Sequence, residues 1–328
     1  MGRSGPDMKS LTTIKMSAEP ISESAIRGFN YQPGYAATGL EIWALKFDAA
    51  RIEDEIARCK TYFPRTNLLR LWLSFDAYLH DRNQFAANFA AVLDIIGRHG
   101  LQAMPCLFNN WHSIPDFGGV AAEMIGYWNH PARCHVFTEY LDAVVGPHGN
   151  DPRVRLWDLC NEPFNSGRAE VFVPWLKQLY EHCRNIGAAA PITVGVPASV
   201  PALELVEPFC DVLTPHCYFA EGLWTKDEAA FCATLDALVG FAEKVGKPIF
   251  AGETGWGAID DAHRARLLRV ELQAFVERNM GFCIHMLNHS LVADGHRSEF
   301  GVVSEAGFMG CIEADGTLRA GHKAINHF

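Results

Sequence analysis

The feature that most constrains the fold of this chain is a regular alternation between short strand-like runs and longer segments with helical spacing. Eight runs rich in apolar and β-branched residues occupy positions 26–31, 67–74, 101–108, 153–160, 191–196, 210–216, 248–253 and 281–287. Between them, apolar residues recur at steps of three and four, as one buried helix face requires. Two such faces consist of Phe85, Phe89, Val92, Ile95 and Ile96, and of Phe231, Leu235, Leu238, Phe241 and Val245. Gly100 and Gly246 follow these segments and are typical of helix C-termini.

Repeated strand–helix units predict an α/β protein whose eight parallel strands close into a (β/α)8 TIM barrel. The alternative is an open, doubly wound sheet. That fold usually carries a glycine-rich phosphate loop after its first strand, where this chain reads Gly28-Phe29-Asn30-Tyr31. We therefore favour the barrel.

The length of 328 residues suits one barrel domain with extended strand-to-helix loops. We expect this catalytic barrel to span 21–328. Residues 1–20 are expected to be a tail whose opening resembles an expression-tag remnant. The longest connections, 109–127, 218–225 and 288–317, follow strands three, six and eight and are expected to shape the substrate cleft.

The charge balance narrows the range of partners. With 28 Lys and Arg against 38 Asp and Glu, the net charge is −10. Binding nucleic acid or an anionic membrane needs a basic surface, so neither is an expected partner, and a neutral substrate fits better. The sequence contains no run of about 18 apolar residues, so it predicts no membrane-spanning helix. The N-terminal residues also lack the apolar segment of a signal peptide, which favours the cytoplasm, although a leader removed beforehand would leave the same sequence.

The ten cysteines include no CxxC pair, and several lie inside apolar runs. This pattern predicts buried free thiols in a reducing compartment and argues against a disulfide framework.

Two glutamates directly follow apolar strands. The fourth strand leads into Asn161-Glu162-Pro163, and the seventh ends at Gly252-Glu253-Thr254. In a closed parallel barrel, the carboxyl ends of the strands form the catalytic rim. Cleaving a glycosidic bond with retention needs two carboxyl groups about 5–5.5 Å apart, one protonated and one ionised. Glu162 and Glu253 are therefore the candidate catalytic pair.

With Asn161-Glu162-Pro163 after strand four and Glu253 on strand seven, the chain resembles clan A retaining glycoside hydrolases, most nearly the family 5 cellulase and mannanase type. The resemblance implies that Glu162 is the acid/base and Glu253 the nucleophile. It also implies that Asn161 contacts the sugar 2-hydroxyl.

Other substrate-binding residues are assigned with the same resemblance in view. Arg70 matches a family arginine near the nucleophile, and His216 and Tyr218 match a His-x-Tyr pattern. Arg70 and the hydrogen bond from Tyr218 would lower the pKa of Glu253. His112 is our choice for a family histidine after strand three, although Asn109-Asn110-Trp111-His112 is an ambiguous match.

The family tryptophan after strand eight is absent, because the chain reads Met286-Leu287-Asn288-His289 there. Asn288 is a candidate substrate contact at this point. Trp256 and Trp224 are the candidate stacking platforms, since aromatic faces suit the C–H faces of a pyranose ring.

The resulting hypothesis is a retaining β-glycoside hydrolase that acts on a β-linked glycoside or oligosaccharide and needs no metal or cofactor. A transglycosylase with the same site is an open alternative, because both share the covalent intermediate. A metal-dependent barrel isomerase or hydrolase is a weaker one, since no His-Glu-x-x-His occurs in the sequence. A catalytically silent sugar-binding barrel would be expected to have lost part of this residue set. The sugar, its linkage and the oligomeric state are not predicted.

Overall fold

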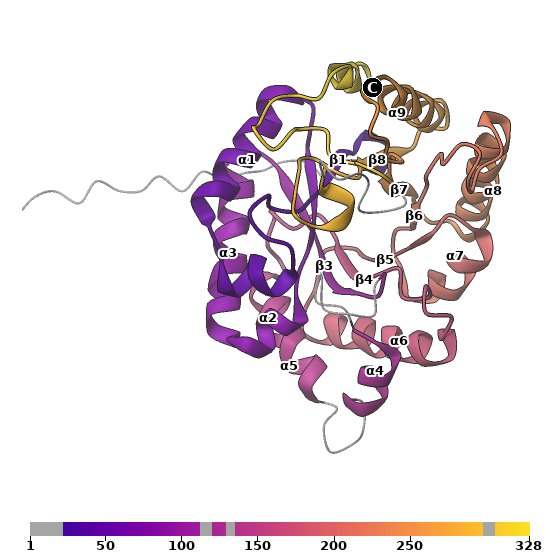
Figure 1. The fold of residues 1–328 in the computed structure, drawn as a ribbon. Coiled ribbons are helices and arrows are strands. Elements are labelled where there is room, and N and C mark those ends of the chain that lie inside the picture. Colours follow the sequence, from indigo (N-terminus) through magenta and orange to yellow (C-terminus); the bar gives the residue numbers. More distant parts are fainter. Residues whose placement is uncertain (1–21, 112–119, 129–134, 298–305) are drawn as a thin grey trace, which may run out of the picture.

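A computed structural model describes residues 22–111, 120–128, 135–297 and 306–328. Its strands close a parallel barrel in chain order, which confirms the predicted (β/α)8 architecture (Figure 1). The strands are β1 (Arg27–Tyr31), β2 (Leu68–Trp72), β3 (Gln102–Asn109), β4 (Trp157–Asn161), β5 (Ile192–Pro197), β6 (Thr214–His216), β7 (Phe250–Thr254) and β8 (Gly281–Ile284). The barrel closes where β1 pairs with β8, for example at Phe29 and Ile284. The predicted tail, residues 1–20, lies outside the described residues.

Helices form the outer ring around the strands (Figure 1). They are α1 (Ala49–Tyr62), α2 (Phe75–His80), α3 (Arg82–Arg98), α4 (Ala122–Trp128), α5 (His135–Val144), α6 (Ala169–Asn185), α7 (Val200–Val206), α8 (Glu228–Val245) and α9 (Asp261–Glu277). Most begin at an Asp or Ser side chain that accepts a backbone N–H of the first turn: Asp48, Ser74, Asp81, Ser199, Asp227 and Asp260. Such caps satisfy N–H groups that have no partner within the helix.

The two helix faces predicted from spacing are confirmed. The five apolar residues chosen on α3 are all buried, and four of the five on α8 are buried. Gly246 ends α8 with φ +68°, the left-handed conformation that glycine adopts without steric cost.

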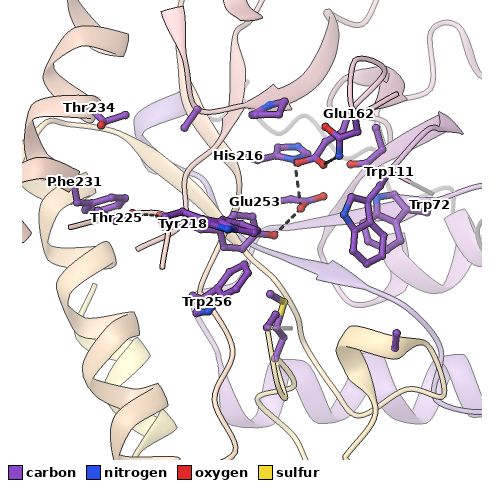
Figure 2. Close-up of a pocket in the computed structure, with 18 residues that line it drawn as sticks. Trp72, Trp111, Glu162, His216, Tyr218, Thr225, Phe231, Thr234, Glu253 and Trp256 are labelled. Carbon is purple, nitrogen blue, oxygen red and sulfur yellow. Dashed lines mark hydrogen bonds and ion pairs between the residues drawn. The ribbon is translucent and has the colours of Figure 1, made fainter. Parts of the chain in front are cut away.

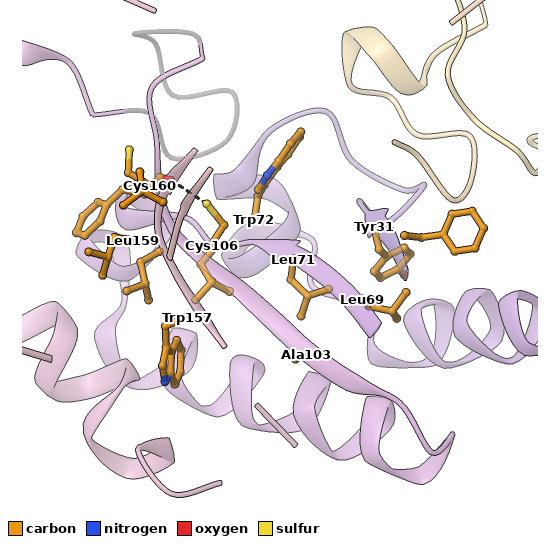
Figure 3. Packing of buried hydrophobic residues seen from close by; sticks show 14 of the residues in the cluster. Tyr31, Leu69, Leu71, Trp72, Ala103, Cys106, Trp157, Leu159 and Cys160 are labelled. Carbon is orange, nitrogen blue, oxygen red and sulfur yellow. Dashed lines mark hydrogen bonds between the residues drawn. The ribbon is translucent and has the colours of Figure 1, made fainter. Parts of the chain in front are cut away.

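Side chains along the strands contribute to two buried clusters, and Figure 3 shows part of the larger one. On β2, Leu69 and Leu71 belong to the large apolar cluster between the strands and the helices. Leu68 has the opposite parity and joins a smaller cluster at the base of the barrel with Ile26, Met104, Leu156, Val212, Phe250 and Cys283. Arg70 and Trp72 share the parity of Leu68, so they occupy successive levels of the barrel interior above this base.

Four strands, β2, β4, β6 and β8, are at least three residues shorter than predicted. β6 begins at Thr214, because residues 207–209 form a short helical turn after α7, and Leu213 makes only an isolated bridge with Ile249. β8 ends at Ile284, three residues early. Beyond it, the backbone of Met286 pairs with Met309 and Cys311 of the C-terminal loop, while the N–H of Leu287 still donates to the carbonyl of Asn30 on β1.

The cysteines of the described chain are free thiols, and all but the half-buried Cys232 are buried, as the sequence predicts. No helix within the described ranges is both long and apolar enough to cross a membrane.

Candidate active site

The two candidate glutamates lie at the carboxyl ends of β4 and β7. Glu253 is within β7 and only 5% exposed, whereas Glu162 directly follows β4 and is partly exposed. Glu162 has φ +46°, a conformation that is unfavourable for a residue with a Cβ. Its N–H donates to the carbonyl of Gly195 on β5, and its carbonyl accepts from Asn165, so the turn is held from both sides. The Glu162 side chain lies beside His216 (Figure 2).

His216 brings the two carboxylates together. Its Nδ1 atom lies 2.7 Å from Oε1 of Glu162 and 3.4 Å from Oε2 of Glu253. One carboxylate oxygen of each glutamate and this ring nitrogen all lie within 4.8 Å of one another. The ring fits because residue 195 is glycine, since a Cβ there would be 2.5 Å from Nε2 of His216. Glu162 and Glu253, which are far apart in the sequence, therefore meet at His216. The space beside the imidazole ring requires a glycine at position 195.

Both oxygens of Glu253 are hydrogen-bonded to groups that favour its charged form. Arg70 donates through Nη1 to Oε1, and the Tyr218 hydroxyl donates to Oε2 at 2.7 Å. Burial alone would raise the pKa of Glu253. The charges of His216, Arg70 and His285 and the Tyr218 hydrogen bond outweigh burial, so the pKa lies well below its ordinary value. Glu253 is therefore an ionised carboxylate at neutral pH.

Arg70 is fully buried and organises the floor of the site. Besides Glu253, its guanidinium donates to Asp158 at 2.7 Å, to Asn30 at 2.7 Å and to Asn161 at 2.7 Å. Arg70 therefore forms ion pairs with both Asp158 and the candidate nucleophile Glu253. A buried cation needs such compensation, because an unpaired one is strongly destabilising.

Asn161 is oriented by its neighbours as well as by Arg70. Its Nδ2 donates to Oδ1 of Asn109, at the end of β3, at 2.9 Å. Asn109 was not among the predicted site residues. Its position as a polar residue at the end of an apolar strand could have identified it.

These groups open into a cavity of about 760 Å³. The predicted residues that line it are Asn161, Glu162, His216, Tyr218, Trp224, Glu253 and Trp256, most of which Figure 2 displays. Arg70 lies beneath them, with its guanidinium 5.7 Å from the ring of Trp72. Asn288 is not brought to the cavity: it is buried, and its Nδ2 donates to the carbonyls of Gln32 and His289. His112 lies outside the described residues.

Aromatic rings form much of the wall. Trp224 and Trp256 contact each other nearly edge to face with centroids 4.3 Å apart, and Trp224 is 64% exposed against 6% for Trp256. Trp72, Trp111 and Phe231 also line the cavity and were not selected as site residues. Trp72 is the last residue of β2, two positions after the inward-facing Arg70. This spacing places both side chains on the same face of the strand and could have identified Trp72 as a site residue.

Glu162, His216 and Glu253 are close enough in space to be considered as metal ligands. The donor set does not fit a divalent cation well. Both oxygens of Glu253 already accept hydrogen bonds, one of them from the permanently charged Arg70, whose charge repels a metal ion. The arrangement suits an acid and base pair better.

The chain matches one family model and is similar to several known proteins. The family model for cellulase (glycosyl hydrolase family 5) matches residues 39–290. Mannan endo-1,4-beta-mannosidase A of Podospora anserina is 30% identical over 104 residues, which are 29% of this chain and 27% of that protein. Beta-glucuronidase of Rattus norvegicus is 23% identical over 240 residues, 71% of this chain and 32% of that protein. The chain thus spans less than a third of the length of either curated relative.

Among solved structures, GH5_18 from Streptomyces cattleya in complex with GlcNAc superimposes with a TM-score of 0.72 and 16% sequence identity. The match covers 92% of this chain and 78% of that one. At this identity the similarity establishes the fold.

Proposed function

Because the chain belongs to glycosyl hydrolase family 5 and is a glycoside hydrolase, we propose that it cleaves a β-linked glycoside or oligosaccharide with retention, through a covalent glycosyl-enzyme. The observation that carries this proposal is that one carboxylate oxygen of Glu162 and one of Glu253 lie within 4.8 Å of each other in one cavity. Retaining enzymes have carboxyl groups about 5–5.5 Å apart, whereas inverting enzymes keep them about 6.5–9.5 Å apart to admit a water.

The first step forms the glycosyl-enzyme. Ionised Glu253 attacks the anomeric carbon as the bond to the leaving oxygen breaks, and Glu162 gives its proton to that oxygen. Tyr218 and Arg70 hold the attacking carboxylate in place. Asn161, whose amide nitrogen gives one hydrogen to Asn109, keeps a second for a sugar hydroxyl.

The second step releases the sugar. Glu162, now a carboxylate, takes a proton from water while the water oxygen attacks the anomeric carbon, and the bond to Glu253 breaks. His216 contacts both carboxylates and so keeps their separation fixed through both steps.

A neutral sugar fits the cavity better than a uronic acid. The charged or titratable residues described on its wall are Glu162, Glu253, His216 and Tyr218, and no Lys or Arg is among them. Arg70, below the wall, is already shared between two carboxylates. Segments 112–119 and 298–305, which adjoin the lining residues Trp111 and Ala306, also contain no Lys or Arg in sequence. A substrate carboxylate would face anions without a counterion.

The decisive experiment uses Glu253→Ala with a panel of aryl β-glycosides. Turnover should be abolished, and added azide should restore it with an α-glycosyl azide as the product, because azide replaces the missing nucleophile on the same face. Glu204→Ala, at an exposed position on α7, serves as the control and should match the wild type. Normal turnover by Glu253→Ala without azide would refute the mechanism.

Glu162→Ala completes the assignment. The variant should slow poor leaving groups far more than activated aryl groups, since only the former need a proton in the first step. Adding an acceptor sugar in excess to the wild-type reaction distinguishes hydrolysis from glycosyl transfer.

A further inference from the structure

Helix α9 carries two fully buried charged side chains that the mechanism above does not use. Arg264 and Glu271 are seven residues apart, two helical turns, and therefore lie on the same face of the helix. Charged groups are rarely buried without a specific role, because removing them from water is costly. Their contacts indicate what they do.

Glu271 connects the two loops that carry the nucleophile and its tyrosine. Its Oε1 atom accepts three backbone N–H groups: Phe219 at 2.7 Å, Gly255 at 3.1 Å and Trp256 at 3.4 Å. Phe219 directly follows Tyr218, and Gly255 is two residues after Glu253. One carboxylate oxygen thus fixes the backbone on both sides of the Tyr218–Glu253 hydrogen bond.

Arg264 holds the next segment of the rim. Its Nη2 donates to the carbonyl of His285 at 3.0 Å and to that of Met309 at 2.8 Å. Met309 lines the cavity, and the charge of His285 acts on Glu253. The approach is close: Gly255 has φ +96°, and a Cβ there would be 2.9 Å from Nη1 of Arg264. One helix therefore anchors the segments after β6, β7 and β8.

We propose that Glu271 is a positioning residue, and that its ionised carboxylate sets the Tyr218 and Glu253 loops in the arrangement that the reaction needs. The effect of Glu271 on catalysis rests on the proposed function. Its role in holding the two loops does not. A charged acceptor holds N–H groups more strongly than a neutral one, roughly twofold in energy. Neutralising Glu271 therefore loosens both loops at once.

The surroundings of Glu271 make this anchor sensitive to pH. Burial raises its pKa to about 7, although hydrogen bonds from Phe219, Gly255 and Trp256 and the charge of Arg264 oppose the rise. The titratable side chains that face Glu271 are Arg264, on α9, and Cys217, after β6. Arg264 in turn faces Cys311, Arg319 and Tyr218.

The sign of the effect differs between activity and stability. As the pH falls through about 7, Glu271 takes a proton in place and the loops lose their charged acceptor, so activity declines. Its folded-state pKa is above the ordinary value of 4.5. Its contribution to stability is therefore fully present below pH 4.5 and is lost as the pH rises through about 7. A residue that served only stability would not change the two in opposite directions.

The test compares Glu271→Gln with Glu277→Gln, an exposed glutamate on the same helix, and with the wild type. At pH 8, Glu271→Gln should lower kcat by about tenfold or more, with KM changed less than threefold. Its Tm should not be below that of the wild type. The acid limb near pH 7 should disappear from its rate profile. Glu277→Gln should match the wild type in each respect.

Amide hydrogen exchange gives a readout that needs no substrate. The N–H groups of Phe219, Gly255 and Trp256 should exchange faster in Glu271→Gln than in the wild type and Glu277→Gln. In the wild type they should lose protection between pH 8 and pH 6, after correction for intrinsic rates. The wild-type series replaces the variant if Glu271→Gln does not fold.

Unchanged exchange, or unchanged kcat in a folded Glu271→Gln, would overturn the inference while leaving the proposed function intact. A wild-type chain that cleaves no panel substrate would overturn the proposed function, and the exchange measurement would still decide the role of Glu271.

Discussion

Glu162 and Glu253 are the same kind of side chain, and their different surroundings suit them to the different roles proposed here. Glu253 is nearly covered and accepts hydrogen bonds from Arg70 and Tyr218. Glu162 lies at the rim, contacts His216 and Asn165, and has no Lys or Arg partner in the described chain. An ionised nucleophile and a proton carrier need this contrast, because each must keep its own protonation state at the same pH.

Tyr218→Phe tests that contrast by removing a single hydrogen bond to Glu253. Removing the hydroxyl leaves one oxygen of Glu253 without its donor, so the carboxylate is oriented less well. We expect kcat/KM to fall by about 10- to 100-fold, because a hydrogen bond to a charged group contributes about 1.5–3 kcal/mol. The lower acid limb, which Glu253 sets and which is distinct from the Glu271 limb near pH 7, should move to higher pH, since the Tyr218 hydrogen bond lowers the pKa of Glu253. Initial rates on one aryl β-glycoside across pH measure both effects.

Tyr180→Phe is the matched control, because Tyr180 lies on α6 and packs on Arg184 with the ring that phenylalanine retains. An unshifted Glu253 limb in Tyr218→Phe would contradict the assigned role of the hydroxyl.

The sequence was informative about the residues that the proposed mechanism uses and less so about the residues that support them. Glu162, Glu253, His216 and Tyr218 stand out because polar groups directly follow apolar strands, and the structure brings them into one cavity. Asn288 also follows a strand, yet its chain has already turned toward residues 309–312, and the residue is buried away from the cavity. Glu271 was not identified at all, because a single glutamate within a helical pattern looks like an ordinary solvent-facing position.

At the scale of the element, local rules decided most of the fold. Spacing identified the buried faces of α3 and α8, and glycine marked their ends. Strand ends were less predictable, because β8 stops where a distant segment, rather than a local signal, takes over its hydrogen bonds. Boundaries set by long-range pairing cannot be read from a local window.

Asp81→Ala tests a local rule in isolation. Asp81 is exposed and caps α3 by accepting the N–H of Gln84 at 3.0 Å, far along the chain from the catalytic residues. Its loss should lower the free energy of unfolding by about 1 kcal/mol while kcat at 25 °C stays unchanged. A shift in the urea midpoint measures the loss. Asp81→Ser, which keeps an acceptor, should recover most of it, and an equal loss in both variants would contradict the capping role.

At the scale of the whole molecule, charge is expected to select the substrate. The chain has a net charge of −10, and two carboxylates stand on the wall of the cavity. Like charges about 5 Å apart repel by about 3 kcal/mol at an effective dielectric constant near 20. The chain is therefore expected to reject an anionic sugar even where the rest of the ring fits.

A matched pair of substrates measures this selection. For the best sugar of the aryl glycoside panel, the corresponding uronide should have a kcat/KM lower by about 100-fold or more. The methyl ester of that uronide has no charge and should recover most of the loss, since it differs only in the carboxylate. Equal turnover of acid and ester would contradict the selection by charge.

The pairing of β1 with β8 has a consequence for how the protein is made. A nascent chain that ends before residue 281 lacks β8, so β1 and the last strand made each present unpaired N–H and C=O groups. Such edges invite pairing between neighbouring chains on a polysome. Synthesis that pauses late, between β7 and β8, should therefore be the stage most prone to aggregation, and emergence of residues 281–284 from the ribosome removes both edges in a single event.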